Sequence, residues 1–221
     1  MEFKDTVTML FGGTGETLRM VLISTFFGYV FGLPLGILLT ITDAEGIRPN
    51  PVLYKILDFI INVTRSVPFL ILLILIQPFT KALVGKSYGT TATIVPLTVA
   101  ATPLIARMVE NSLKEVDKGV IEAAFSMGAG YLTIIRKVLV TEARTSLLVG
   151  VTIALGTILG YSAMAGVIGG GGLGDIAIRY GYYRYETGIM IITVLVLVVL
   201  MQILQWIGMF VSKKVDRRRG N

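Results

Sequence analysis

A run of glycines at positions 169–175, GGGGLGD, has the composition of a loop that cradles phosphate. A nucleotide-binding loop of that kind also carries a Lys followed by Ser or Thr and comes after a β-strand, whereas this run follows a long apolar stretch. We therefore expect a turn without nucleotide chemistry, and two interpretations stay open: a flexible or re-entrant turn, and a plain loop. The glycines concerned are Gly169, Gly170, Gly171, Gly172 and Gly174.

Other kinds of site chemistry are excluded by residue type. The chain has no cysteine and no histidine, so disulfides, metal sites built from Cys or His, and catalysis by either side chain are ruled out. We expect no catalytic residue, no metal and no cofactor.

Polar residues within apolar surroundings mark a second candidate site. The stretch GYSAM at 160–164 places Tyr161 and Ser162 in an apolar segment, where polar groups turn toward a partner or an aqueous cavity. Met164 has an adaptable thioether that suits a path for an apolar solute. Ordinary packing between helices explains the same three residues equally well. Asp58 is expected to be an interface residue rather than a proton relay.

The elements that position these residues are membrane-spanning helices. Of the 221 residues, 54% are hydrophobic and 15% are charged, well below the quarter that is charged in soluble domains. Four windows without charge have 23, 20, 30 and 26 residues, and a helix needs about 20 to cross a bilayer. A fifth window, 66–80, has 15 residues, and the stems of Arg65 and Lys81 would have to close the gap. Pro68 is expected to bend this span locally.

The fold class is therefore an all-α integral membrane protein with five spans, at roughly 16–41, 58–80, 88–107, 146–168 and 188–211. The N-terminal residues have two early acids and no basic region, so the first span is expected to be a retained anchor rather than a signal peptide.

The charges predict the orientation. When the basic residues are assigned to alternate sides, 14 of the 20 fall on one side and 6 on the other. The positive-inside rule then places the C-terminus and the segment 119–146 in the cytoplasm, with residues 1–13 outside. The basic tail, 206–221, is expected to be a stop-transfer segment rather than a nucleic-acid site.

The longest cytoplasmic excursion, between Arg107 and Thr145, contains two short helical patterns. The third helix is expected to run on and stop at Gly119, followed by VIEAAFSM and YLTIIRKVLV, in which Leu132, Ile135 and Leu139 mark one face. Gly128 and Gly130 would allow a sharp bend between the two. By physics alone, this pair is either an amphipathic element on the lipid headgroups or a docking element for a cytoplasmic partner.

The stretch EAAFSMGAGYLTIIRKVLVTEA resembles the EAA loop of bacterial ABC importer permeases of type I. The pattern is Glu-Ala-Ala, three residues, Gly, then a small aliphatic run and usually Pro; Thr141 stands at the position of that Pro, which puts the exit angle of the loop in doubt. The resemblance implies that residues 119–142 form a coupling-helix pair that docks on an ATPase. The implied coupling residues are Glu122, Ala123, Ala124, Gly128, Ile135, Val138 and Leu139.

Within that family the chain resembles the methionine-uptake permeases, through RSVPFLILLILIQPFT (65–80), TIVPLTVAATPLIARMVENSL (93–113) and GYSAMAGVIGGGGLGDIAIRYGYYRY (160–185). The resemblance implies a permease domain over 14–205 in the cytoplasmic membrane, working as a homodimer with two ATP-binding subunits and an extracytoplasmic methionine-binding protein. The subunit itself would do no chemistry and would carry D- or L-methionine.

Three rival functions stay open. The same permease could serve another cargo, such as another amino acid, a phosphonate or a sulfonate. A secondary transporter working alone is disfavoured, because the sequence shows no inverted repeat and places no acid deep in a span. A membrane scaffold without a transport path is the third.

Overall fold

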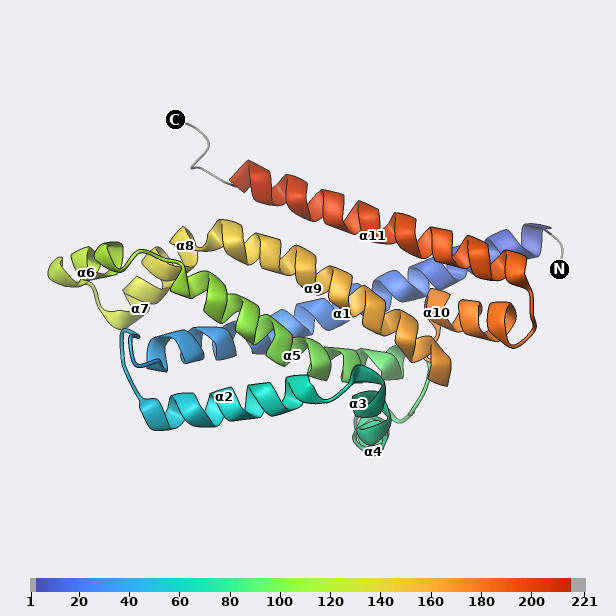
Figure 1. The fold of residues 1–221 in the computed structure, drawn as a ribbon, viewed down its shortest axis with the longest axis horizontal. Helices are drawn as coiled ribbons and strands as arrows, with labels where there is room; N and C mark the ends of the chain where they lie inside the picture. The colour runs from blue at the N-terminus through green and yellow to red at the C-terminus, as the bar shows by residue number, and fades with distance from the viewer. Residues whose placement is uncertain (1–2, 216–221) are drawn as a thin grey trace.

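The computed structural model describes residues 3–215, and within that range every regular element is a helix (Figure 1). In chain order the elements are α1 (Phe3–Thr42), α2 (Pro51–Ser66), α3 (Phe69–Leu75), α4 (Gln77–Val84), α5 (Thr90–Lys114), α6 (Lys118–Ser126), α7 (Tyr131–Thr133), the π-helix η1 (Ile134–Leu139), α8 (Val140–Glu142), α9 (Arg144–Ala165), the 3-10 turn η2 (Gly166–Ile168), α10 (Gly172–Ile176), the π-helix η3 (Ala177–Tyr182) and α11 (Thr187–Val215).

Four of the five predicted spans are confirmed as long apolar helices: α1, α5, α9 and α11. Helix α1 is longer than predicted, because residues 3–13 continue the helix rather than forming a separate segment before it. Its 40 residues give a length of about 60 Å, twice the thickness of a bilayer core. At the other end of the chain, α11 includes 206–215 of the predicted tail, and 216–221 lie outside the described residues.

The predicted single span over 58–80 is wrong in shape. The chain turns by 100° between α2 and α3, so this span is a broken one, and α4 follows as a further short helix. The break lies at Val67, which is extended with φ −77° and ψ 122°, directly before Pro68. A residue before proline is driven out of the helical region by the proline ring, and Pro68 then begins the next helix.

The third long helix ends earlier than predicted. Helix α5 ends at Lys114 rather than at Gly119, and α6 begins four residues later. The carboxylate of Asp117 accepts a hydrogen bond from the backbone N–H of Gly119 at 2.6 Å, which caps the new helix.

The core of the subunit is the close pairing of α1 with α5. Gly28, Gly32 and Gly36 recur every four residues along α1 and face α5. A Cβ on Gly32 would stand 2.8 Å from the carbonyl oxygen of Thr102, and one on Gly36 would stand 2.6 Å from that of Ala106. Small residues at this spacing let two membrane helices approach until their backbones touch.

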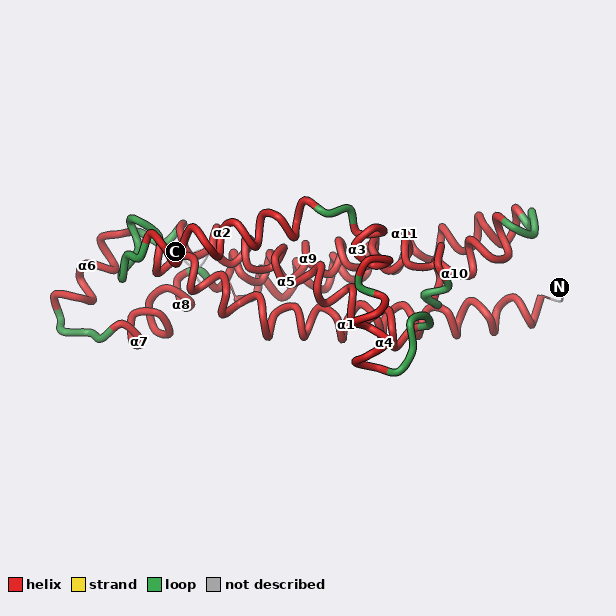
Figure 2. Tube along the Cα trace, turned by 90° about the horizontal axis from the view of Figure 1, so that it is seen from below, coloured by secondary structure: helices red, strands yellow, loops and turns green. Residues whose placement is uncertain are grey.

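The long helices place two groups of short elements at opposite ends of the molecule. The α1–α2 connection and α6 to α8 lie at one end, and the starts of α1 and α11 lie with α10 at the other (Figure 1). Figure 2 shows the helices running along one axis, with the loops gathered near the two ends and beside α3 and α4. This alternation agrees with the order of sides used in the charge count.

Candidate functional site

The coupling segment predicted at 119–142 forms two short helical pieces joined by a tight turn. Helix α6 ends in a glycine cap: the N–H of Gly128 donates to the carbonyl of Phe125 at 2.8 Å, and that of Ala129 to Ala124 at 3.1 Å. Gly128 has φ +80°, a left-handed conformation that L side chains rarely adopt. The predicted bend at Gly128 is therefore present, and the chain reverses there into α7.

The seven predicted coupling residues do not share one surface. Glu122, Ala123 and Gly128 are exposed, whereas Ala124 and Leu139 are buried in the core of the subunit. Ile135 and Val138 are half-buried and pack against that core. The structure thus leaves the first half of the motif accessible and turns the second half inward.

The large apolar side chains that the segment exposes are ones that the motif does not include: Val120, Phe125, Met127, Tyr131 and Leu132. Met127 is 80% exposed and Leu132 is 66% exposed. The rings of Phe125 and Tyr131 meet edge to face across the Gly128 turn, with their centroids 5.8 Å apart. The sequence did carry a signal for these residues, because they flank the predicted bend on both sides.

Thr141, at the position where the family usually has Pro, stays inside the helical path. Its hydroxyl donates to the carbonyl of Arg136 at 3.2 Å, and the chain continues as α8. The segment leaves α8 through Ala143, with φ −80° and ψ 0°, directly before α9. The segment thus passes into α9 at Ala143, two residues after Thr141.

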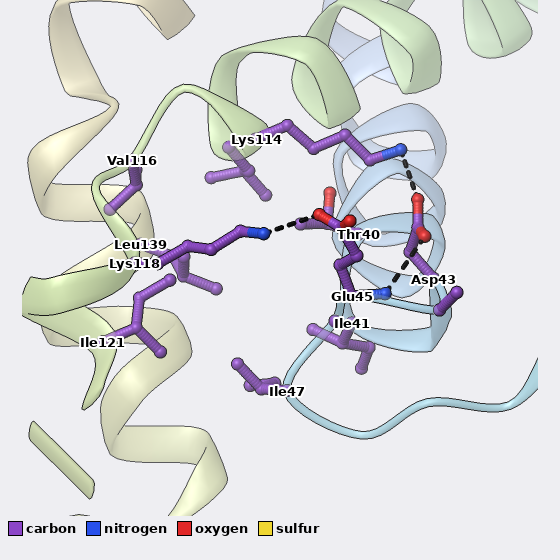
Figure 3. Close-up of a pocket in the computed structure, with 13 residues that line it drawn as sticks. Thr40, Ile41, Asp43, Glu45, Ile47, Lys114, Val116, Lys118, Ile121 and Leu139 are labelled. Atoms are coloured by element: carbon purple, nitrogen blue, oxygen red, sulfur yellow. Dashed lines mark hydrogen bonds and ion pairs between the residues drawn. The ribbon is translucent and has the colours of Figure 1, made fainter.

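A pocket of about 360 Å³ separates the coupling segment from the α1–α2 connection (Figure 3). Two ion pairs cross it: Lys118 Nζ lies 2.6 Å from Glu45 Oε2, and Lys114 pairs with Asp43. The hydrogen bond from Lys114 holds the pKa of Asp43 below its ordinary value. The hydrogen bond to Glu45 raises the pKa of the exposed Lys118 above its ordinary value.

A larger charged cluster lies between α2 and α5. Glu110 is only 2% exposed, and its carboxylate lies 2.6 Å from Arg107 Nη1 and 2.9 Å from Lys114 Nζ. Arg107 also pairs with Asp58, which gives Asp58 a partner 49 residues away along the chain. The sequence predicted Glu110 on the part of the third helix that runs out into water, whereas the structure buries it. With two cationic neighbours, this acid is not a free site for a coupling ion.

The predicted substrate-path residues lie on α9, beside the break between α2 and α3. The ring of Tyr161 stacks on that of Phe69, with centroids 4.6 Å apart and planes 4° apart. Met164 is exposed, whereas Ser162 is buried and donates its hydroxyl to the carbonyl of Leu159 at 2.7 Å. The structure thus brings together the bend at Pro68 and one of the three predicted residues.

The glycine run is a packed turn held by two helices. Glu16 and Thr17 of α1 accept the N–H groups of Gly172 and Leu173 at 2.7 and 2.9 Å. From α5, Thr93 donates its hydroxyl to the carbonyl of Gly170 at 3.2 Å. The run leads into α10 and η3, which fold back between α1, α9 and α11. The glycine run is thus a turn fixed by contacts with α1 and α5.

Nearly the whole chain is similar to known proteins. A family model described as a binding-protein-dependent transport system inner membrane component matches residues 32–217. A probable D-methionine transport system permease protein of Vibrio cholerae is 51% identical over 210 residues, 95% of this chain and 93% of the relative. The D-methionine transport system permease protein of Escherichia coli is 51% identical over 158 residues, 72% of this chain and 73% of the relative.

Among solved structures, an inward-facing conformation of the MetNI methionine ABC transporter superposes with a TM-score of 0.96. It is 46% identical and covers 98% of this chain and 100% of the other. An amino acid ABC transporter solved with histidines superposes with a TM-score of 0.78 over 97% of this chain and 99% of the other; at 21% identity it shows likeness of fold alone.

Proposed function

Since the chain belongs to the family of binding-protein-dependent transport system inner membrane components, we propose that it is the permease subunit of an ABC importer that carries methionine across the cytoplasmic membrane. The observation that carries the proposal is the coupling segment. It presents five large apolar side chains to solvent at one end of a membrane bundle, where a lone subunit gains nothing from exposing them. Identity of about one half to D-methionine permeases supports the cargo.

The proposed assembly is a homodimer of this subunit with two ATP-binding subunits on the coupling segments. An extracytoplasmic methionine-binding protein delivers the cargo at the opposite end, beside α10. The basic side is cytoplasmic, with the N-terminus outside. A groove on each ATP-binding subunit receives the exposed face made by Phe125, Met127, Tyr131 and Leu132, in the manner of a helix in a groove.

In this assembly the subunit performs no hydrolysis. ATP binding closes the partner subunits, and the coupling segments move with them. The long helices then shift between outward and inward access, because the two states differ in what is bound on the partners.

The cargo path runs past α9 in this proposal. Tyr161 and Met164 offer an aromatic face and a polarizable thioether to an apolar amino acid. Ser162 contributes through packing, because its hydroxyl is bound within its own helix.

The proposal is tested by reconstituting the permease with its ATP-binding subunits and binding protein in liposomes. We expect uptake of radiolabelled methionine that requires ATP. Glu122→Lys and Gly128→Asp are expected to abolish both ATPase association and uptake, since Glu122 is exposed and Gly128 holds the turn. Lys55→Gln, an exposed change on α2, is the matched control and should leave both intact.

Each rival has its own outcome in this assay. Uptake driven by a proton or sodium gradient without ATPase subunits would identify a secondary transporter. Intact assembly and uptake in both coupling variants would favour a scaffold. Competition of labelled methionine uptake by other amino acids, phosphonates or sulfonates measures the breadth of the cargo.

A further inference from the structure

Helix α2 has a weak apolar attachment to the rest of the subunit. Its one buried residue is Ile61, 3% exposed, which meets Leu39 of α1 and Ala106 of α5 in a small cluster, with Tyr54 and Leu57 half-buried against it. Phe59 and Ile60 point away from that cluster and are exposed. The position of α2 therefore depends strongly on its polar contacts.

Those polar contacts form one stripe on α2. Tyr54, Asp58 and Asn62 recur every four residues, so they lie on one face of the helix. The hydroxyl of Tyr54 donates to Glu110 Oε1 at 3.2 Å, and Arg107 Nη2 donates to Asn62 Oδ1 at 2.9 Å as well as to Asp58. The amide of Asn62 donates in turn to Asp58 Oδ2 at 3.1 Å.

The stripe continues without a gap into the coupling segment. From Glu110 the chain of contacts runs to Lys114 and then to Asp43, whose carboxylate also accepts the N–H of Glu45 at 3.3 Å. The side chain of Glu45 pairs with Lys118, the first residue of α6 (Figure 3). A line of polar contacts thus joins the start of the coupling segment to the near end of α2.

The far end of α2 reaches the candidate cargo path. Its 16 residues give a rigid length of about 24 Å. The chain then turns at Pro68, and the next residue, Phe69, stacks on Tyr161 of α9. A tilt of α2 that begins at Tyr54, near its start, would therefore reach the Phe69–Tyr161 pair through the turn at Pro68.

From this arrangement we infer that Arg107, Glu110 and the polar stripe of α2 are positioning residues for transport, which carry the displacement of the coupling segment to the Phe69–Tyr161 pair. The inference rests on the proposed function. The line is stiff at its centre, where Glu110 is buried and paired with Arg107 and Lys114, because any slip there leaves a charge unpaired in a medium of low dielectric. The exposed ion pair of Lys118 with Glu45 joins this centre to the coupling segment.

The test measures methionine imported per ATP hydrolysed by the complete complex in liposomes. Asp58→Asn should lower this ratio by about tenfold, the size typical of coupling between two sites, while assembly and ATP hydrolysis persist. Tyr54→Phe removes a single hydroxyl from the stripe and should lower the ratio less. Lys55→Gln, on the same helix but outside the stripe, should match the wild type.

A double-mutant cycle tests the continuity of the line. Distant independent sites have additive effects on free energies. If Lys118 and Asp58 act through one line, Lys118→Gln with Asp58→Asn should lower the ratio no further than the stronger single change.

Additive effects, or an unchanged ratio in Asp58→Asn and Tyr54→Phe, would overturn the inference. If Asp58→Asn prevents assembly, the ratio of the Tyr54→Phe complex decides. A wild-type complex that accumulates no methionine with ATP refutes the proposed function instead, so the two failures are distinguishable.

Discussion

Two glycines in the coupling segment differ in the sign of the backbone angle φ. Gly128 has φ +80° and Gly130 has φ −74°, and a Cβ added to either would meet no atom within 4 Å. We expect Gly128→Ala to lower the free energy of unfolding by about 1 kcal/mol, because alanine is strained at positive φ. Gly130→Ala should be neutral or stabilise by about 0.4–1 kcal/mol. Thermal unfolding of the purified subunit measures both, and equal shifts would contradict the assignment of strain to Gly128.

The ion pair of Asp43 with Lys114 predicts a loss of stability in acid. The folded pKa of Asp43 lies below its ordinary value of 3.8 because Lys114 donates to it. The pair therefore contributes fully above pH 3.8 and is lost as the pH falls through the lowered folded pKa. Asp43→Asn should melt below the wild type at neutral pH, and the difference should shrink as the pH falls below about 4. Melting curves over pH 3–7 test this; a constant difference would be contrary to the prediction.

The ion pair of Lys118 with Glu45 is lost at high pH, when Lys118 loses its proton. Its folded pKa is raised above the ordinary 10.5 by Glu45, so this contact is complete below pH 10.5 and is lost as the pH rises through the folded value. Because Lys118 is fully exposed, its ion pair with Glu45 contributes little to the stability of the fold. We expect its loss to change the position of the coupling segment instead.

Among the elements, the end of α9 and the start of α10 pack with their backbones in close contact, at Gly166 and Gly174. A Cβ on Gly166 would run into the backbone of Gly174, whereas one on Gly160, two turns earlier, would meet nothing within 4 Å. Gly166→Ala is expected to destabilise the subunit by about 1–3 kcal/mol through overpacking, and Gly160→Ala to stabilise its helix by up to about 1 kcal/mol. Thermal unfolding in detergent compares the pair. Similar melting temperatures for both variants would show that the crossing is loose.

The long helices were predictable because charge is excluded over their whole length, a signal that needs no knowledge of neighbours. The break at Pro68 was predicted only as a local bend, since the angle depends on where α3 packs. The burial of Glu110 was not predictable, because it depends on two partners: Tyr54, which lies on a second helix, and Lys114, which lies one turn further along α5. A charge near a helix end looks exposed until its partners are placed.

The face of the coupling segment was mispredicted for a geometric reason. A period of 3.6 residues groups Ile135 with Leu139, but residues 134–139 form a π-helix, in which the N–H of Val140 bonds to the carbonyl of Ile135. The wider turn brings residues five apart close to one face, and Ile134 and Leu139 are both buried. Leu132 falls outside that turn and is left exposed.

For the molecule as a whole, this division separates the surface that we propose meets the ATP-binding subunits from the core of the subunit. Leu132→Glu should leave the melting temperature of the subunit unchanged and weaken its co-purification with the ATP-binding subunits. Leu139→Ala should cost about 2–5 kcal/mol of stability, because Leu139 is 2% exposed. Melting curves and pull-down of the partner subunits distinguish the two residues. Loss of stability in Leu132→Glu would show that its side chain serves the fold.

Helix α5, on which the glycines of α1 pack, is synthesised well after α1. Helix α5 ends at Lys114, 72 residues after the end of α1 at Thr42. A ribosome that adds roughly 5–20 residues per second takes several seconds to cover that distance. During this interval Gly28, Gly32 and Gly36 face lipid or the insertion machinery without the helix that they fit. Until α5 has been made, the glycine face of α1 is therefore open to pairing with any other membrane helix that carries small residues.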